Sequence, residues 1–144
     1  MADRPTLFVD RSLGKSVGRL LRGAGVAVEL HDDHFAQTEL DRNWIPIVTG
    51  RGWVILTKDK NIRRPSGERE DVLLAGAKVF TLTSGNMNAA NMAAIFIRFV
   101  DEIEQIAATQ TPPFAYAVGP DGLQQIQLNP VPPPPPSDED NSNG

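Results

Sequence analysis

The stretch WVILTKDKNI, residues 53–62, joins a strand-like apolar run to an abrupt charged end. Residues 54–56 are all aliphatic, which is typical of a short strand buried on both faces. The run stops at residues 58–60, where one carboxylate stands between two ammonium groups. In open α/β sheets, ligands bind outside the carboxyl ends of the strands. The triplet therefore predicts that Asp59 lies at a functional edge of a sheet.

The composition is that of an ordinary folded protein. The chain has 144 residues, 40% hydrophobic and 22% charged, which is enough for one domain with one core. It has no apolar run of eighteen residues, no signal-peptide pattern and no cysteine, so we expect no membrane contact and a cytoplasmic location. The formal net charge is −4, and three of the acids lie at residues 138–140. The remaining charge of −1 neither supports nor excludes binding to RNA.

Strand-like and helix-like segments alternate along the chain. Four β-rich runs are separated by helical patterns; the runs are 6–9, 26–30, 53–57 and 78–83, and the helices 12–25, 38–52, 66–77 and 88–108. Ser12 is a candidate cap for the first helix, and Thr38 or Asp41 for the second. The alternation predicts an α/β fold with a mostly parallel sheet of four or more strands. Right-handed crossovers would place helices on both faces, giving three layers.

The C-terminal part departs from this alternation. Two strand-like runs flank the turn sequence GPDG at residues 119–122, which predicts a β-hairpin. Five consecutive prolines and an acidic end follow, and such a segment cannot bury enough apolar area to order itself. We therefore expect an α/β domain at 1–110, a hairpin extension at 111–129 and a disordered tail at 130–144.

Acidic residues recur where the predicted strands end. Asp10 follows the first strand, HDDH at residues 31–34 follows the second, and Asp59 follows the third. Asp41 would join them from a helix N-terminus. Each has a simpler reading: Asp10 and Asp41 as helix caps, Asp59 as the closure of an Asx-turn. A solvated turn is the favoured reading of HDDH, because the chain offers no further His or Cys for a zinc site.

Carboxylates that converge on one edge repel one another unless they bind a proton or a cation. Mg²⁺ and Mn²⁺ prefer oxygen ligands, lower the pKa of bound water and neutralise charge on a phosphoryl group. The bases near these acids could hold an RNA backbone, or could form a solvated rim: Arg11, Lys15, Lys58, Lys60, Arg63 and Arg64.

Three segments together resemble the PIN-like domains related to VapC-type toxin ribonucleases. They are FVDRSLGKSVGRLLRGAGVAVELHDDHF (8–35), LDRNWIP (40–46) and GWVILTKDKNIRR (52–64), and the resemblance runs from about residue 6 to 106. It implies a single three-layer domain and a metal-dependent endoribonuclease with Mg²⁺ or Mn²⁺. The catalytic and metal-binding acids then fall on Asp10, Asp41 and Asp59. Many family members have a fourth acid after the next strand, where this chain has Ser84, Asn86 and Asn88; Asp33 is a candidate substitute.

On this resemblance the substrate is single-stranded RNA, held by Arg11, Lys58, Lys60, Arg63 and Arg64. The candidate partners are a cognate antitoxin protein and a second copy of the chain. The alternative is a catalytically degenerate PIN-like module that binds RNA or a protein without cleavage. A phosphate-accepting receiver domain is disfavoured, because it needs an acidic pair after the first strand, where this chain has Asp10 and Arg11.

Overall fold

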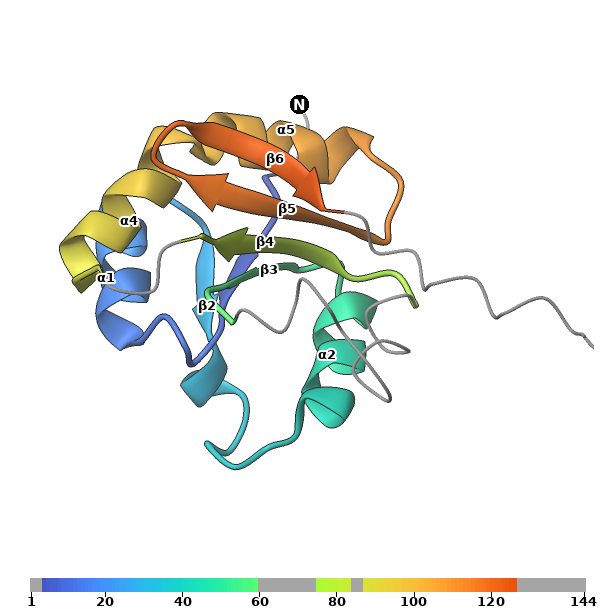
Figure 1. The fold of residues 1–144 in the computed structure, drawn as a ribbon. Helices are drawn as coiled ribbons and strands as arrows, with labels where there is room; N and C mark the ends of the chain where they lie inside the picture. Colours follow the sequence, from blue (N-terminus) through green and yellow to red (C-terminus); the bar gives the residue numbers. More distant parts are fainter. Residues whose placement is uncertain (1–3, 60–74, 84–86, 127–144) are drawn as a thin grey trace, which may run out of the picture.

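One six-stranded sheet organises the protein. The computed structural model describes residues 4–59, 75–83 and 87–126. The strands stand in the order β2-β1-β3-β4-β5-β6; they are β1 (Leu7–Val9), β2 (Val28–Leu30), β3 (Val54–Thr57), β4 (Lys78–Leu82), β5 (Phe114–Gly119) and β6 (Gly122–Ile126). The first five are parallel and β6 runs antiparallel to β5 (Figure 1). The expected mostly parallel sheet and the C-terminal hairpin are both confirmed.

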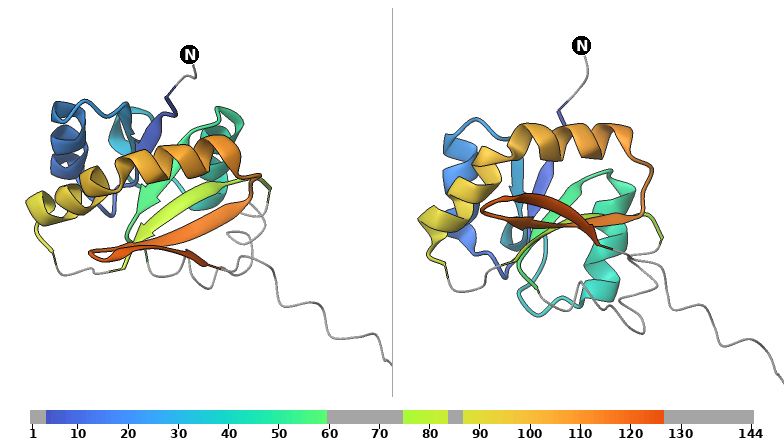
Figure 2. Two further views of the ribbon diagram at one scale, coloured as in Figure 1. Left: turned by 90° about the horizontal axis from the view of Figure 1, so that it is seen from above. Right: turned by 45° about the horizontal axis from the view of Figure 1, so that its top comes forward.

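Helices cover both faces of this sheet (Figure 2). Three of them lie on one face, namely α1 (Lys15–Gly23), α4 (Ala89–Arg98) and α5 (Val100–Thr109), and α2 (Asp41–Gly50) lies on the other. The side chains of successive strand residues point to opposite faces. Accordingly Leu7 and Val9 pack with the core under α1 and α4, whereas Phe8 packs with the core under α2. The sheet is therefore buried on both sides, as the aliphatic run in β3 predicted.

The register brings the ends of β1 and β3 to the same edge. Val9 pairs with Leu56, and the amide of Asp10 donates a hydrogen bond to the carbonyl of Leu56 at 2.9 Å. Thr57, the last residue of β3, pairs with Thr81 of β4. Residues that follow these strands consequently emerge together at the carboxyl edge of the sheet.

The helix boundaries differ from the expected ones in two places. Gly14, with φ of 89°, is the N-cap of α1 in place of Ser12, whose hydroxyl is engaged elsewhere. Leu40 is the N-cap of α2, so Asp41 is its first helical residue and not its cap.

The expected long helix at 88–108 is two helices. Phe99 interrupts it with φ of −108° and ψ of 12°. Phe96 before the break and Ile103 after it are both buried in the same core. The bend therefore keeps the apolar side of both halves on the sheet, as expected for helices that wrap around a core. The expected helix at 66–77 falls mostly, and the tail at 130–144 wholly, outside the described residues.

Candidate functional site

Asp10, directly after β1, is held by two hydroxyl groups. Its Oδ2 accepts hydrogen bonds from Ser12 Oγ at 2.9 Å and from Thr57 Oγ1 at 2.8 Å. These two hydroxyl oxygens lie 3.1 Å apart. Thr57 is only 2% exposed, so its side chain has a fixed position at the end of β3. The carboxylate of Asp10 is thus oriented by groups from its own loop and from the neighbouring strand.

The same two hydroxyls also fix the start of the charged triplet. The amide of Lys58 donates to Ser12 Oγ at 3.2 Å, and the amide of Asp59 donates to Thr57 Oγ1 at 3.1 Å. The backbone that carries Asp59 is therefore tied to the groups that orient Asp10. This arrangement explains why a buried strand ends in a charged triplet: the last strand residue anchors an acid at the sheet edge.

Asp41 approaches from the first turn of α2. Its Oδ1 accepts a hydrogen bond from the indole Nε1 of buried Trp44 at 3.0 Å. One pocket is lined by all three acids together with an apolar floor, and we call it the acidic pocket: Asp10, Asp41, Trp44, Ile45, Ile55, Thr57 and Asp59. The structure thus brings Asp10, Asp41 and Asp59 to one depression, although they come from three separate elements.

The oxygen atoms that line the acidic pocket belong to carboxylates and a hydroxyl, which are ligands that a hard cation prefers. Within residues 4–59, 75–83 and 87–126, however, no three His, Cys, Asp or Glu side chains are grouped closely enough to hold a metal ion. Mg²⁺ commonly takes only one or two protein carboxylates and completes its shell with water and substrate phosphate. The residues present therefore fit a divalent ion by the chemistry of their oxygen atoms.

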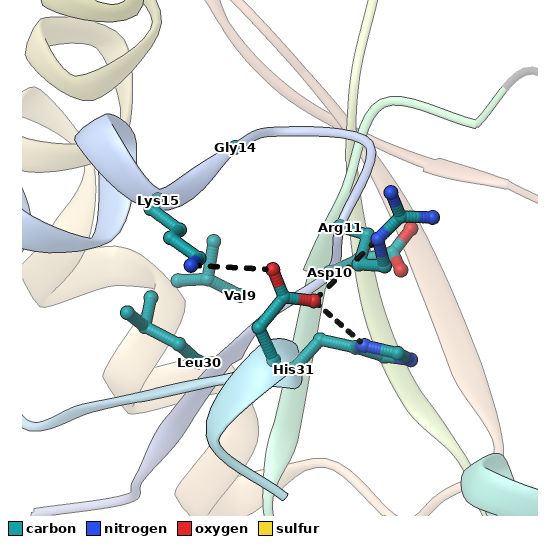
Figure 3. Close-up of a pocket in the computed structure, with 8 residues that line it drawn as sticks. Val9, Asp10, Arg11, Gly14, Lys15, Leu30 and His31 are labelled. Carbon is teal, nitrogen blue, oxygen red and sulfur yellow. Dashed lines mark ion pairs between the residues drawn. The ribbon is translucent and has the colours of Figure 1, made fainter. Parts of the chain in front are cut away.

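A second pocket lies on the other side of Asp10, and we call it the Asp32 pocket (Figure 3). Its lining is Val9, Asp10, Arg11, Gly14, Lys15, Leu30, His31 and Asp32. In Figure 3 one carboxylate stands among three nitrogen-bearing side chains. Asp32 Oδ1 lies 3.5 Å from Arg11 Nε and 3.6 Å from His31 Nδ1, and Asp32 Oδ2 lies 3.8 Å from Lys15 Nζ.

The HDDH segment is only partly the solvated turn that we expected, because Asp33 and His34 are exposed but His31 is buried. Residues 31–33 form a short 3-10 helix, and His31 is 3% exposed. The ring of His31 packs edge-on against Trp44, with centroids 5.3 Å apart, and lies 5.5 Å from Phe35. Aromatic neighbours, one of them on α2, therefore bury it. Asp33 is exposed and lines neither pocket.

The expected substrate-binding residues are only partly described. Arg11 faces Asp32 and donates from Nη1 to the carbonyl of Gln37 at 3.2 Å, and Lys58 is half-buried beside the acidic pocket. Lys60, Arg63 and Arg64 lie outside the described residues, as do Ser84 and Asn86. Asn88 caps α4, since its side chain accepts a hydrogen bond from the amide of Asn91 at 2.8 Å.

Three residues that the structure puts beside Asp10 were not placed at the site from the sequence, namely Ser12, Thr57 and Asp32. Ser12 looked like a helix cap, because hydroxyls are favoured there. Thr57 was only the last residue of the third predicted strand, and the signal that could have marked it is a hydroxyl at the end of an otherwise aliphatic strand. Asp32 was passed over for Asp33, because burial in a short turn cannot be deduced from two adjacent acids.

The fold, with acids at the carboxyl edge of a parallel sheet, defines an α/β class whose members carry a polar site at that edge. A family model described as a PIN-like domain matches residues 5–84, which is more than half of the chain. The chain belongs to the PIN-like domain family.

A curated relative indicates the subgroup of the PIN-like family to which the chain is related. The chain is 36% identical over 131 residues to a protein of Mycobacterium tuberculosis (strain ATCC 25618 / H37Rv) named "Putative ribonuclease VapC45". The match covers 88% of this chain and 94% of that protein, so the two are alike along nearly their whole lengths. The chain is thus related to VapC-type toxin ribonucleases. No solved structure matches it significantly. Among the described residues, no helix is both long and apolar enough to cross a bilayer.

Proposed function

We propose that this protein is a metal-dependent endoribonuclease that cleaves single-stranded RNA and acts as the toxin of a toxin–antitoxin pair. The observation that carries the proposal is the acidic pocket, where Asp10, Asp41 and Asp59 meet in a chain of the PIN-like family. The name of the M. tuberculosis relative supports the ribonuclease activity. We assign the site to residues 1–110 and regard 111–129 and 130–144 as accessory segments.

In this proposal Asp10, Asp41 and Asp59 supply the oxygen ligands for Mg²⁺ or Mn²⁺. Such an ion would neutralise charge on the scissile phosphate and lower the pKa of a bound water. Ser12 and Thr57 keep Asp10 in one orientation, and the indole of Trp44 does the same for Asp41. Asp33 is exposed, so we do not include it among the ligands.

The substrate side of the proposal rests on the bases around these acids. Lys58 stands between Thr57 and Asp59, and in this proposal its ammonium group contacts the phosphate at the metal site. Arg11 follows Asp10 in the same way on the neighbouring strand. Positive side chains next to a metal-binding edge would hold the RNA backbone by charge, and their contribution would weaken with salt. Lys60, Arg63 and Arg64 follow in sequence and would extend this basic segment.

The test is a cleavage assay on single-stranded RNA with Mg²⁺, Mn²⁺ or a chelator. We expect cleavage only with metal, and its loss in Asp59→Asn while the melting curve shows an intact fold. A matched control is Glu102→Gln, which neutralises one acid on α5, an element that lines neither pocket. Cleavage that survives the chelator, or full activity in Asp59→Asn, would disprove the metal-site mechanism.

A second function has one observation in its favour. No three acids of the described residues are grouped closely enough to hold a metal ion. A wild-type protein that binds RNA or a partner protein but cleaves no RNA with either metal would therefore be a degenerate PIN-like binding module.

A further inference from the structure

The Asp32 pocket contains polar atoms that the fold leaves without a hydrogen bond. His31 Nδ1 and Asp32 Oδ1 are buried and have no hydrogen-bond partner among the described residues. His31 is 3% exposed, and it lines the pocket beside Asp32. Buried polar atoms are usually paired, so each exception needs an explanation. Here the unpaired atoms belong to a pocket that also opens to Asp10.

The surroundings of Asp32 are those of an anion-binding site. Arg11 and Lys15 approach it, and their side chains are 45% and 54% exposed. Helix α1 begins at this pocket, because Gly14 and Lys15 line it. The N-cap Gly14 has no side chain to pair with the helix amides, and the first turn of α1 contains no acid. Free amides and the helix dipole at this end favour a negative group. Two cations and a helix N-terminus therefore surround the carboxylate of Asp32.

The contacts of Asp32 with its cations are loose. The distances of 3.5 and 3.8 Å exceed those of charge-assisted hydrogen bonds, which are about 2.7–2.9 Å. The ends of Arg11 and Lys15 are about half exposed, so water competes with Asp32 for them and these long ion pairs contribute less free energy than close ones. Arg11 and Lys15 can thus turn toward a second anion that enters the same pocket.

We propose that Asp32 occupies a phosphate subsite in the free protein, and that a backbone phosphate of the RNA takes over Arg11 and Lys15 when it binds. This inference rests on the proposed function, because it names RNA as the ligand. Asp10 lines both pockets, so a phosphate held here belongs to a nucleotide next to the one at the acidic pocket. Asp32 then keeps His31 Nδ1 as its neighbour and restrains RNA binding by competition.

A phosphate fits this place better than a metal ion does. A metal ion would meet the charges of Arg11 and Lys15, which repel it. A phosphate offers several acceptor oxygens, and Arg11 can bind two of them with its planar guanidinium group. An exchange of loose ion pairs for close hydrogen bonds favours the bound state.

The experiment measures equilibrium binding of a fluorescent single-stranded RNA oligonucleotide to the full chain in chelator, where cleavage does not interfere. Asp32→Asn keeps the shape of the side chain and removes its charge. We expect it to bind RNA about two- to fivefold more tightly than wild type at low salt. The gain should shrink between about 50 and 200 mM salt, because competition between charges is screened.

Matched variants separate this effect from a general change in charge. Glu102→Gln removes the same charge from α5 and should leave the affinity at its wild-type value. The gain from Asp32→Asn should vanish in the Arg11→Gln/Lys15→Gln background, because Asp32 acts on both of these residues. Melting curves confirm that each variant is folded, and Asp32→Ser serves as a second charge-free replacement.

Three results would overturn the inference. An equal gain in Glu102→Gln, or a gain that persists in the Arg11→Gln/Lys15→Gln background, would mean that Asp32 does not restrain these cations. Displacement of the RNA by polyglutamate as readily as by unlabelled RNA would assign the pocket to an acidic protein partner. Each of these three results leaves metal-dependent cleavage by the wild type untouched, whereas absence of RNA binding in all variants would refute the proposed function as well.

Discussion

The acidic pocket and the Asp32 pocket share Asp10 and yet are built on opposite principles. In the acidic pocket, two hydroxyls orient Asp10 and an indole donates a hydrogen bond to Asp41, and these donors are neutral. In the Asp32 pocket a single acid faces two cations at distances too long for hydrogen bonds. Neutral donors orient a carboxylate without cancelling its charge, whereas cations cancel the charge without fixing the orientation. The arrangement in the acidic pocket suits carboxylates that bind a cation. The arrangement in the Asp32 pocket suits a carboxylate that another anion can replace.

The strongest test of this comparison neutralises one acid in each pocket, with Asp10→Asn in one variant and Asp32→Asn in another. We expect Asp10→Asn to lower RNA cleavage by about a thousandfold or more, because it removes a proposed metal ligand and leaves the hydroxyls with a neutral acceptor. Asp32→Asn should leave metal-dependent cleavage in place. Initial rates at saturating Mn²⁺ measure both variants. Comparable losses in the two would show that the pockets do not differ in role.

Removing the strand-end hydroxyl tests whether orientation matters as well as charge. Thr57→Val keeps the volume of the buried side chain but deletes a donor to Asp10 and the acceptor for the amide of Asp59. We expect cleavage to fall about 10- to 100-fold, as is usual for groups that orient metal ligands. Thr57→Ser should restore most of the activity, and metal titrations should show weaker Mn²⁺ binding in Thr57→Val alone. Equal activity in the Val and Ser variants would contradict the orienting role.

A third substitution, Gly18→Ala, displaces Leu30 in the lining of the Asp32 pocket. A Cβ added to Gly18 would lie 2.0 Å from Leu30 Cδ2, and Leu30 lines that pocket. We expect Gly18→Ala to cost about 1–3 kcal/mol of stability, because Leu30 is buried and must shift. The gain in helix propensity from alanine offsets only part of this cost. Chemical denaturation measures the change, and Gly23→Ala, where an added Cβ meets nothing within 4 Å, is the control on the same helix.

The smallest expected effect concerns the indole donor of the acidic pocket. Trp44→Phe removes the hydrogen bond to Asp41 while it keeps an aromatic ring in the core. We expect a loss of about 1 kcal/mol in stability, or somewhat more if the smaller ring leaves a cavity. Cleavage should fall by only a few-fold, since Asp41 keeps its place on α2. A loss of activity as large as that in Asp10→Asn would mean that Asp41 depends on Trp44 for its position.

The fold and the meeting of the acids could be predicted because both follow from short-range patterns. Aliphatic runs that alternate with helical segments specify a parallel sheet, and parallel strands end at one edge. Asp10 and Asp59 are therefore brought near each other by topology alone. The break at Phe99 could not be predicted in this way, because no Pro or Gly stands there and the apolar spacing continues through it.

The burial of His31 and the true role of Ser12 depended on partners far away in the chain. His31 is buried by Trp44 and Phe8, which belong to α2 and β1. Ser12 meets Thr57, 45 residues further on, so a local capping rule gave it the wrong role. The roles of side chains with such long-range contacts can be assigned only once the sheet register is known.

The order of the elements along the chain has a consequence for synthesis on the ribosome. Every described residue that lines the acidic pocket lies within the first 59 residues, yet β3 stands between β1 and β4 in the sheet. A nascent chain that ends near Asp59 therefore contains all three acids. Its β3 has no β4 to pair with, so backbone groups at that edge are unpaired, and its core lacks Phe80 and Phe96. We expect it to remain unassembled until β4 and α4 have emerged. If the protein is a ribonuclease, it cannot cut RNA near its own ribosome before most of its chain has been made.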